Sequence, residues 1–303
     1  MDAATRTSHG RSKLRRRLAV LAVDRVPPHL YFVLSAVFHA LGPAFAVLLF
    51  ARVDVLGVAW LRIASAAALF AVWRRPWRLW GRIDGRGRRL LAALGLCLAL
   101  MNSCFYLAID RLSLGTVATI EFLPVIALAA IGARTRRNVA ALAIAGPGVL
   151  MITGFGGAGD PLGAVFAFAN AGFFALYIVC AHRVARDLAE VSGIDGLALA
   201  MLAALVMVTP IGGWQVASVA LDPTALLAGV AVGLSSSVVP YVTDQLAMRR
   251  LSRGTYSLLI SLLPVTATVI GFIVLGQVPS PAEAAGIALV VTGVALHRDP
   301  EEA

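Results

Sequence analysis

The sequence predicts an all-α integral membrane protein with ten transmembrane helices, arranged as two inverted five-helix repeats, and with both termini in the cytoplasm. Long apolar runs, the placement of the arginines and an internal repeat each point to this fold. The 303 residues are 59% apolar and 14% charged, with a mean hydropathy of +0.85, whereas soluble domains carry roughly 25% charged residues. Apolar runs of about 20 residues cross a bilayer as helices, which satisfy every backbone polar group internally.

The ten predicted helices follow a basic arm, residues 1–28, that ends at Pro27 and Pro28. The first apolar run is too long for the core of a signal peptide and lacks a convincing cleavage site, so we expect it to be retained. The predicted spans are 30–50, 55–73, 90–109, 114–132, 139–155, 161–182, 195–217, 224–246, 255–275 and 281–297. The domains are then the cytoplasmic arm 1–28, a first repeat 29–156, a second repeat 157–298 and a cytoplasmic tail 299–303.

The arginines give an independent test of this topology, because short cytoplasmic loops are enriched in Lys and Arg. With the N-terminus inside, 23 of the 26 basic residues fall on cytoplasmic segments, and the longest of these is the Arg-rich connection 74–89. The exceptions are Arg52, Arg111 and, within a span, Arg62. The net charge of +10 therefore indicates a membrane topology rather than a nucleic-acid partner.

The internal repeat is visible as matching pairs of residues at an offset of 139. Leu112-Ser113 recurs as Leu251-Ser252, and Thr153-Gly154 recurs as Thr292-Gly293. Pro124 and Pro264 agree with this offset within one residue. Because five helices are an odd number, the second copy is inserted upside down, which is the architecture of many secondary transporters with a substrate site near the midplane.

Of the 16 acids, Glu121 and Asp244 alone lie clearly within predicted spans. Ionisable groups are costly inside a bilayer and usually face a cavity or a partner. Glu121 could therefore face an aqueous cavity, exchange a proton and attract a cationic group. The alternative is structural: one of the acids pairs with Arg62, or Asp244 extends to the cytoplasmic interface.

Other polar groups share helical faces that could line the same cavity. Tyr241 and Asp244 follow Ser237 on one stripe, Asn170 and Tyr177 form a second stripe with Phe173 and Phe174, and Asn102 lies one turn before Tyr106. Such stripes also arise from simple packing, and that reading stays open. Gly229 and Gly233 have the G-x-x-x-G spacing of close helix packing.

Prolines within the spans predict kinked, gating helices. Pro43, Pro124, Pro240 and Pro264 each remove a helix bond to the carbonyl four residues earlier. Two of the freed carbonyls, those of Ile120 and Ser236, adjoin Glu121 and Ser237. Freed carbonyls are tolerated in membranes where they face a cavity or a neighbouring side chain.

Four segments carry a resemblance to a known family. The runs MNSCFYLAIDRLSLGTVATIEFLPVIAL (101–128) and PYVTDQLAMRRLSRGTYSLLISLLPVTATVIGFIVLGQ (240–277) resemble the EamA family of the drug/metabolite transporter superfamily, and LRIASAAALFAVWRRPWRL (61–79) and ALYIVCAHR (175–183) extend the similarity. The resemblance implies a ten-helix, two-repeat fold and export of small metabolites, amino acids in particular, across the bacterial inner membrane.

Individual positions also match the amino-acid exporters of that family. The matching residues are Arg62, Asn102, Tyr106, Glu121, Pro124, Pro240 and Tyr241. Asp244 stands where those exporters have a glutamate, and His39 stands where they have a glutamine. The resemblance thus implies a substrate site that includes Glu121, Asn102, Tyr106, Arg62, Tyr241, Asp244 and His39, to which the stripe analysis adds Asn170 and Tyr177.

Together these observations predict a secondary transporter that exports small hydrophilic amino acids of the threonine/homoserine type, with Glu121 as the candidate proton-coupling residue. Export of another metabolite or of a drug-like compound is the first alternative, and a proton-independent uniporter is also open. An integral membrane enzyme is disfavoured because the five histidines and three cysteines are scattered without ligand spacing. A non-transporting membrane scaffold is a further alternative. We expect contacts with membrane lipid and with a small-molecule substrate, and no cofactor, metal site or nucleic-acid partner.

Overall fold

A computed structural model describes residues 27–124, 135–152, 160–188, 191, 193–248, 250, 259 and 262–296. All regular structure in these ranges is helical. In the first half it comprises α2 (Pro28–Leu49), α3 (Val55–Arg74), α4 (Trp77–Trp80), α5 (Gly85–Ile109), α6 (Leu114–Glu121) and α8 (Arg136–Ile152). In the second half it comprises α9 (Pro161–Asp187), α10 (Gly193–Gly212), the 3₁₀-helix η1 (Gly213–Val219), α11 (Pro223–Gly233), the π-helix η2 (Leu234–Val238), α12 (Val239–Met248), α14 (Leu263–Leu275) and α15 (Pro281–Leu296).

Within the described residues, six helical segments are long and apolar enough to cross a membrane. They are Leu30–Leu49, Val55–Arg74, Gly85–Ile109, Pro161–Asp187, Gly193–Ala217 and Pro223–Asp244. Shorter apolar helices cover Leu263–Leu275 and Pro281–Leu296. The count of ten and the cytoplasmic termini stay predictions, because residues 1–26, 125–134, 153–159, 251–258 and 297–303 lie outside the described residues.

Some helix boundaries differ from those predicted, for local reasons. The connection 74–89 contains the short helix α4 and the start of α5, where the Asp84 carboxylate caps the helix by accepting from Gly87 N at 2.7 Å. Helix α6 ends at Glu121, Phe122 forms a turn and residues 123–124 are helical again, so the helix is interrupted within the predicted span 114–132, whose residues 125–132 lie outside the described part of the chain. Pro124 cannot donate to Ile120 O, and the Phe122 amide donates to that carbonyl instead.

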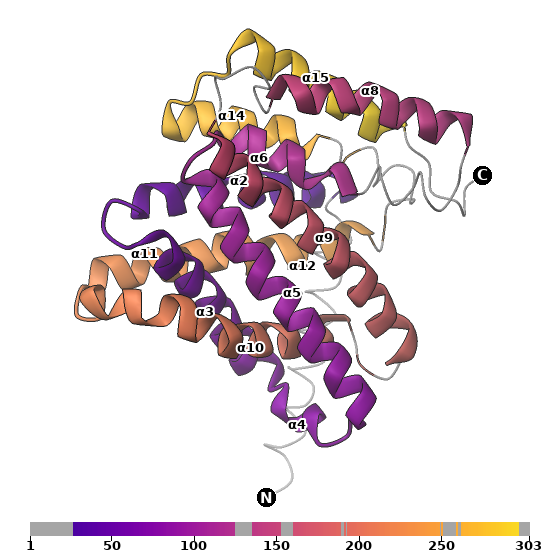
Figure 1. The fold of residues 1–303 in the computed structure, drawn as a ribbon. Coiled ribbons are helices and arrows are strands. Elements are labelled where there is room, and N and C mark those ends of the chain that lie inside the picture. Colours follow the sequence, from indigo (N-terminus) through magenta and orange to yellow (C-terminus); the bar gives the residue numbers. More distant parts are fainter. Residues whose placement is uncertain are drawn as a thin grey trace, which may run out of the picture.

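Figure 1 shows how the helices are layered. Helices α8 and α15 run side by side at the top of the view, with α14 beneath them, and α2 and α6 lie near the centre. The long helix α5 crosses the molecule diagonally and packs against α9 and α10, while α3, α10 and α11 form the lower left of the view. The most extensive helix contacts therefore join the first half of the chain to the second.

Glycines allow several of these helices to approach at backbone distance. A Cβ on Gly233 of α11 would collide with Ser65 Oγ of α3, and a Cβ on Gly229 would lie 2.9 Å from Leu61 Cδ1. The G-x-x-x-G pair predicted to pack closely thus faces α3. Gly148 and Gly286 play the same part between α8 and α15, because a Cβ on either would lie within 2.7 Å of the other's carbonyl oxygen.

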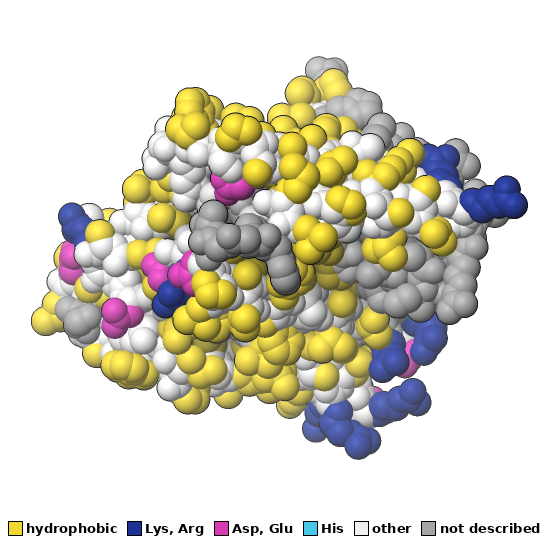
Figure 2. All heavy atoms as spheres, turned by 45° about the horizontal axis from the view of Figure 1, so that its top comes forward, with side chains coloured by type: hydrophobic (Ala, Val, Ile, Leu, Met, Phe, Trp, Pro, Cys, Tyr) yellow, Lys and Arg dark blue, Asp and Glu magenta, His cyan; other side chains and the backbone are white. Residues whose placement is uncertain are grey.

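Charged side chains gather at two ends of the molecule, with apolar surface between them (Figure 2). At the end to which α4 and the start of α5 belong, the exposed residues include Arg75, Arg78, Arg82, Arg86 and Arg89; we call this the basic end. At the opposite, acidic end, aspartates 54, 160 and 222 stand at the N-caps of α3, α9 and α11. The Asp160 carboxylate accepts from Gly163 N and pairs with Arg111 at 3.1 Å, which holds its pKa below the usual range.

The α8–α15 contact yields a stability prediction with a control in the same helix. Gly148→Ala should lower the free energy of unfolding in detergent by about 1–3 kcal/mol, because the new methyl group overpacks against Gly286 O and Leu289. Gly146→Ala meets open space and should be neutral or stabilise by up to about 1 kcal/mol through helix propensity. Thermal unfolding followed by circular dichroism compares the two variants. Equal midpoints would contradict the close packing of α8 on α15.

Candidate functional site

Arg62 lies in the middle of α3 and makes its polar contacts with the second half of the chain. Its Nη2 donates to the carbonyl oxygen of Ser236 at 3.1 Å, and its Nε donates to Ser237 Oγ at 3.2 Å. Its Cζ also lies 5.6 Å from the centre of the Tyr106 ring on α5, within the range of a cation–π contact. A partly buried cation is thereby paired with a carbonyl, a hydroxyl and an aromatic ring, which offsets part of its desolvation cost.

The carbonyl that binds Arg62 is one that Pro240 leaves free. Residues 234–238 form a π-helix between α11 and α12, and Pro240 follows at the start of α12. Pro240 has no N–H to offer Ser236 O, so this oxygen is available to a side chain. Ser35 Oγ of α2 donates to the carbonyl of Pro240 itself at 3.3 Å. The irregular turn thus presents backbone oxygens to both α2 and α3.

Around Arg62, three fully buried polar side chains have unused hydrogen-bonding atoms. Tyr106 and Asn170 are 0% exposed and Ser236 is 1% exposed. No hydrogen bond within 3.5 Å reaches Tyr106 OH, either polar atom of the Asn170 amide or Ser236 Oγ in the described part of the chain, although Tyr106 faces Arg62 and Ser236, and Asn170 faces Glu121. Such atoms are costly to bury unless a water or a ligand satisfies them. We call Arg62, Tyr106, Asn170, Ser236 and Glu121 the central cluster.

Glu121, the last residue of α6, belongs to the central cluster by proximity. Asn170 and Arg62 are the neighbours that act on its carboxylate. Glu121 also lines a cavity of about 20 Å³ together with His39 of α2. Arg62 in turn lies within Coulombic range of His39. The structure therefore brings Arg62, Glu121, Asn170 and His39 together from four different helices.

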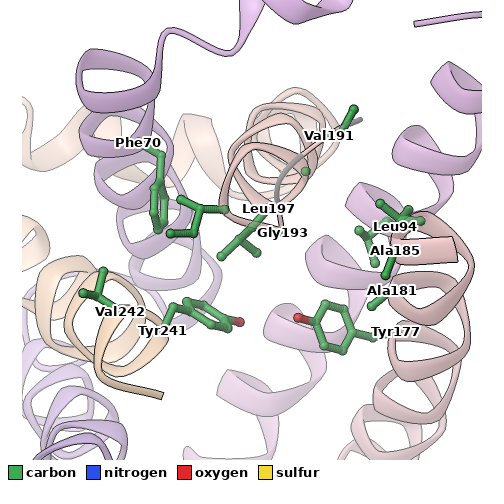
Figure 3. A pocket seen from close by; sticks show the side chains of 13 residues that line it. Phe70, Leu94, Tyr177, Ala181, Ala185, Val191, Gly193, Leu197, Tyr241 and Val242 are labelled. Carbon is green, nitrogen blue, oxygen red and sulfur yellow. The ribbon is translucent and has the colours of Figure 1, made fainter. Parts of the chain in front are cut away.

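A larger cavity of about 420 Å³ opens next to the cluster, towards the basic end. Tyr177 of α9 and Tyr241 of α12 point towards one another across it, with their hydroxyl oxygens facing (Figure 3). Asp244 acts electrostatically on both tyrosines. The remaining lining is largely apolar and comes from α3, α5, α9, α10, α12 and the segment before α10: Phe70, Leu94, Ala181, Val184, Ala185, Val191, Gly193, Ile194, Gly196, Leu197 and Val242.

At the opposite, acidic end, contacts join the two halves of the chain. Gln277 Oε1 accepts from the backbone N–H of Leu114 at 3.0 Å, at the start of α6. Glu283 Oε1 accepts from Ser113 Oγ at 3.3 Å and from Thr116 Oγ1 at 3.1 Å. A Cβ on Gly115 would collide with Thr268, so α6 and α14 also touch here. None of these contact residues lines the large cavity.

The other predicted site residues are placed less centrally. Asn102 is buried, but its Nδ2 donates at 2.7 Å to Leu98 O of its own helix. Phe174 packs between Phe122 and Tyr177, with ring centroids 6.0 and 6.2 Å away, which favours a packing role.

The prolines predicted to kink gating helices occupy different positions. Pro43 lies inside α2, and Pro124 follows the end of α6. Pro240 follows the π-helix, and Pro264 occupies the first turn of α14, where a missing N–H costs no helix bond.

Several groups at the site or at the acidic end were not predicted from the sequence. Ser236 and Ser237 were not predicted to bind Arg62, although the triplet 235–237 before Pro240 was a visible signal. Gln277 and Glu283 carried no sequence signal, because their partners lie more than 160 positions away along the chain.

Comparisons with known proteins agree with this architecture. Residues 161–298 match the model of the EamA-like transporter family. The threonine/homoserine exporter RhtA of Salmonella typhimurium is 28% identical over 86% of this chain and 89% of its own length. RhtA of Escherichia coli K12 is 28% identical over 82% of this chain and 84% of its own length.

A crystal structure of a protein 19% identical in sequence covers 89% of this chain and 95% of that chain with a TM-score of 0.53, a likeness that bears on the fold alone. The apolar helices together with these relatives indicate a multi-pass protein of the inner membrane. The chain carries an EamA-like transporter domain and is similar over most of its length to amino-acid exporters.

Proposed function

We propose that the protein is a secondary transporter that exports small hydrophilic amino acids of the threonine/homoserine type by alternating access. The observation that carries the proposal is the central cluster, whose buried and unpartnered polar atoms lie beside a cavity of about 420 Å³. That volume falls within the roughly 300–1,000 Å³ of small-molecule sites. The names of the relatives supply the cargo class and the direction of transport.

The central cluster offers a partner for each of the two charges of a zwitterion. A charge removed from water must find a partner of opposite charge or strong hydrogen bonds. Arg62 uses two of its five N–H donors on Ser236 and Ser237, which leaves donors for a carboxylate. Glu121 and the Asn170 amide oxygen could accept from an ammonium group, and Tyr106 and Tyr241 could provide ring faces. Asp244 would attract the ammonium at the cavity mouth.

The apolar walls of the large cavity support one refinement of the cargo. Phe70, Leu94, Ile194, Leu197 and Val242 surround the two tyrosines and offer few polar partners. A cargo with a small apolar side chain would fit these walls as well as threonine does. Another metabolite with an amino-acid headgroup is therefore the second candidate.

Two features support the inverted repeat and the sidedness of transport. If the halves are inverted copies, α2 corresponds to α9, α3 to α10, α5 to the α11–α12 segment, α6 to α14 and α8 to α15. The contact α5–α9 then corresponds to α2–α12, α10–α5 to α3–α11, and α9–α6 to α2–α14. The contacts α3–α10, α6–α14 and α8–α15 each join a helix to its own counterpart. By the positive-inside rule the basic end is cytoplasmic. The cavity would then be open to the cytoplasm, where an exporter loads its cargo, and closed at the acidic end by Gln277 and Glu283.

Cysteine labelling tests the cavity and its sidedness. In a variant with Cys97, Cys104 and Cys180 replaced by serine, Ala185→Cys should react with a membrane-impermeant maleimide in inside-out vesicles, because Ala185 is exposed and lines the cavity. Val206→Cys is the control. It is 72% exposed but lies within the apolar span of α10, and it should stay unlabelled. Labelling of Ala185→Cys in right-side-out vesicles alone would invert the topology.

Transport assays test the role of Glu121. In everted vesicles loaded by uptake of labelled threonine or homoserine, Glu121→Gln should lower the rate about 10–100-fold, which corresponds to a charge-assisted bond of roughly 1.5–3 kcal/mol. Asp110→Asn, an exposed acid at the end of α5, should transport like the wild type. Uptake with and without a pH gradient separates a proton-linked exporter from a uniporter. Unchanged rate and pH dependence in Glu121→Gln would remove Glu121 from the mechanism.

A further inference from the structure

The small cavity beside Glu121 is separate from the large one. It is lined by residues of α2, α5, α6 and α14, namely Ala36, His39, Ala40, Phe105, Leu114, Ala118, Glu121, Phe122, Leu263 and Ala267. The large cavity is lined chiefly by α3, α9, α10 and α12, and the two sets of lining residues have no member in common. Glu121 therefore borders a space that neither Tyr177 nor Tyr241 lines.

The contents of the small cavity suggest what it holds. Its volume of about 20 Å³ exceeds the roughly 10–15 Å³ that one water molecule needs. Among the residues that line it, His39 and Glu121 are the two with titratable side chains, and the rest are alanine, leucine and phenylalanine. A water in this space would have an imidazole and a carboxylate as its polar neighbours, in an otherwise apolar enclosure.

The neighbouring elements set the charge around this pair. Arg62 of α3 lies within Coulombic range of both His39 and Glu121. Helix α9 contributes the neutral Asn170 amide beside Glu121, and α5 contributes Tyr106, which faces Arg62. Helix α12 contributes Tyr241, which interacts with Glu121, and Asp244, which interacts with that tyrosine. Because Arg62 keeps its charge, a proton on His39 adds a like charge beside it, whereas a proton on Glu121 removes an opposite one.

We propose that His39 is the proton-relay partner of Glu121 and that protons reach Glu121 through the small cavity while the amino acid uses the large one. In the inward step an imidazolium N–H bond breaks, one water carries the proton, and an O–H bond forms on the Glu121 carboxylate. The neutral imidazole then takes a proton from bulk water in the conformation open at the acidic end. This inference rests on the proposed function, because the coupled cargo is the amino acid bound at the central cluster.

The first measurement is the ratio of threonine uptake with a pH gradient to uptake without one, in proteoliposomes. The wild type should give a ratio well above one, and His39→Gln should bring it to about one because glutamine cannot carry a proton. His182→Gln, which changes an exposed histidine of α9 outside both cavities, should keep the wild-type ratio. A wild-type ratio retained in His39→Gln overturns the relay. Should His39→Gln unfold in detergent, His39→Asn replaces it.

A second measurement does not depend on the cargo. Infrared difference spectra in detergent report the protonated carboxyl band of Glu121, which is assigned by its loss in Glu121→Gln. If His39 and Glu121 share a proton path, the titration of this band should differ between the wild type and His39→Gln and stay unchanged in His182→Gln. Identical titrations in all three overturn the inference, even if threonine is transported. If the wild type does not transport amino acids but the titration of Glu121 still depends on His39, the proposed cargo is wrong and the proton path stands.

Discussion

The bond between the Arg62 guanidinium and the carbonyl of Ser236 is the interaction on which the rest of the site depends. A cation near the middle of a membrane span must be paired, because its desolvation is otherwise too costly. Here the partner is a backbone oxygen of a π-helix, with Ser237 Oγ and the Tyr106 ring completing the surroundings. Because these groups come from α3, α5 and the α11–α12 segment, the pairing holds both halves of the chain around the central cluster.

Small residues make this pairing geometrically possible. The guanidinium can reach Ser236 because α3 and α11 approach at backbone distance, with Gly233 against Ser65 and Arg62 O. On the other side of the π-helix, a Cβ on Gly42 of α2 would collide with Ser236. A larger residue at either glycine would separate the helices that the arginine joins. Packing and electrostatics are therefore coupled at this point. The glycines let the helices approach closely, and the Ser236 carbonyl that Pro240 leaves free accepts from the Arg62 guanidinium.

What the sequence could predict follows from how local each signal is. Apolar runs and the placement of arginines are local and anticipated six spans and the basic end. The proline rule is also local and anticipated that Ser236 O would be free. It could not say that Arg62, 174 positions earlier in the chain, would bind it. The same rule indicated that Ile120 O would lose its donor at Pro124, but the residue pattern does not say that the Phe122 amide would bind this oxygen and that α6 would end at Glu121.

The distribution of charge distinguishes the two halves even though their contacts correspond. Position 62 carries an arginine, whereas the position 139 residues later is Met201, which is 2% exposed. Asp244 corresponds in the same way to the buried Phe105. Each charge of the site thus occurs in one half alone. A symmetric scaffold can rock between two equivalent shapes, but an asymmetric set of charges meets a different environment in each. That difference is what a carrier needs if cargo and proton are to be bound on one side and released on the other.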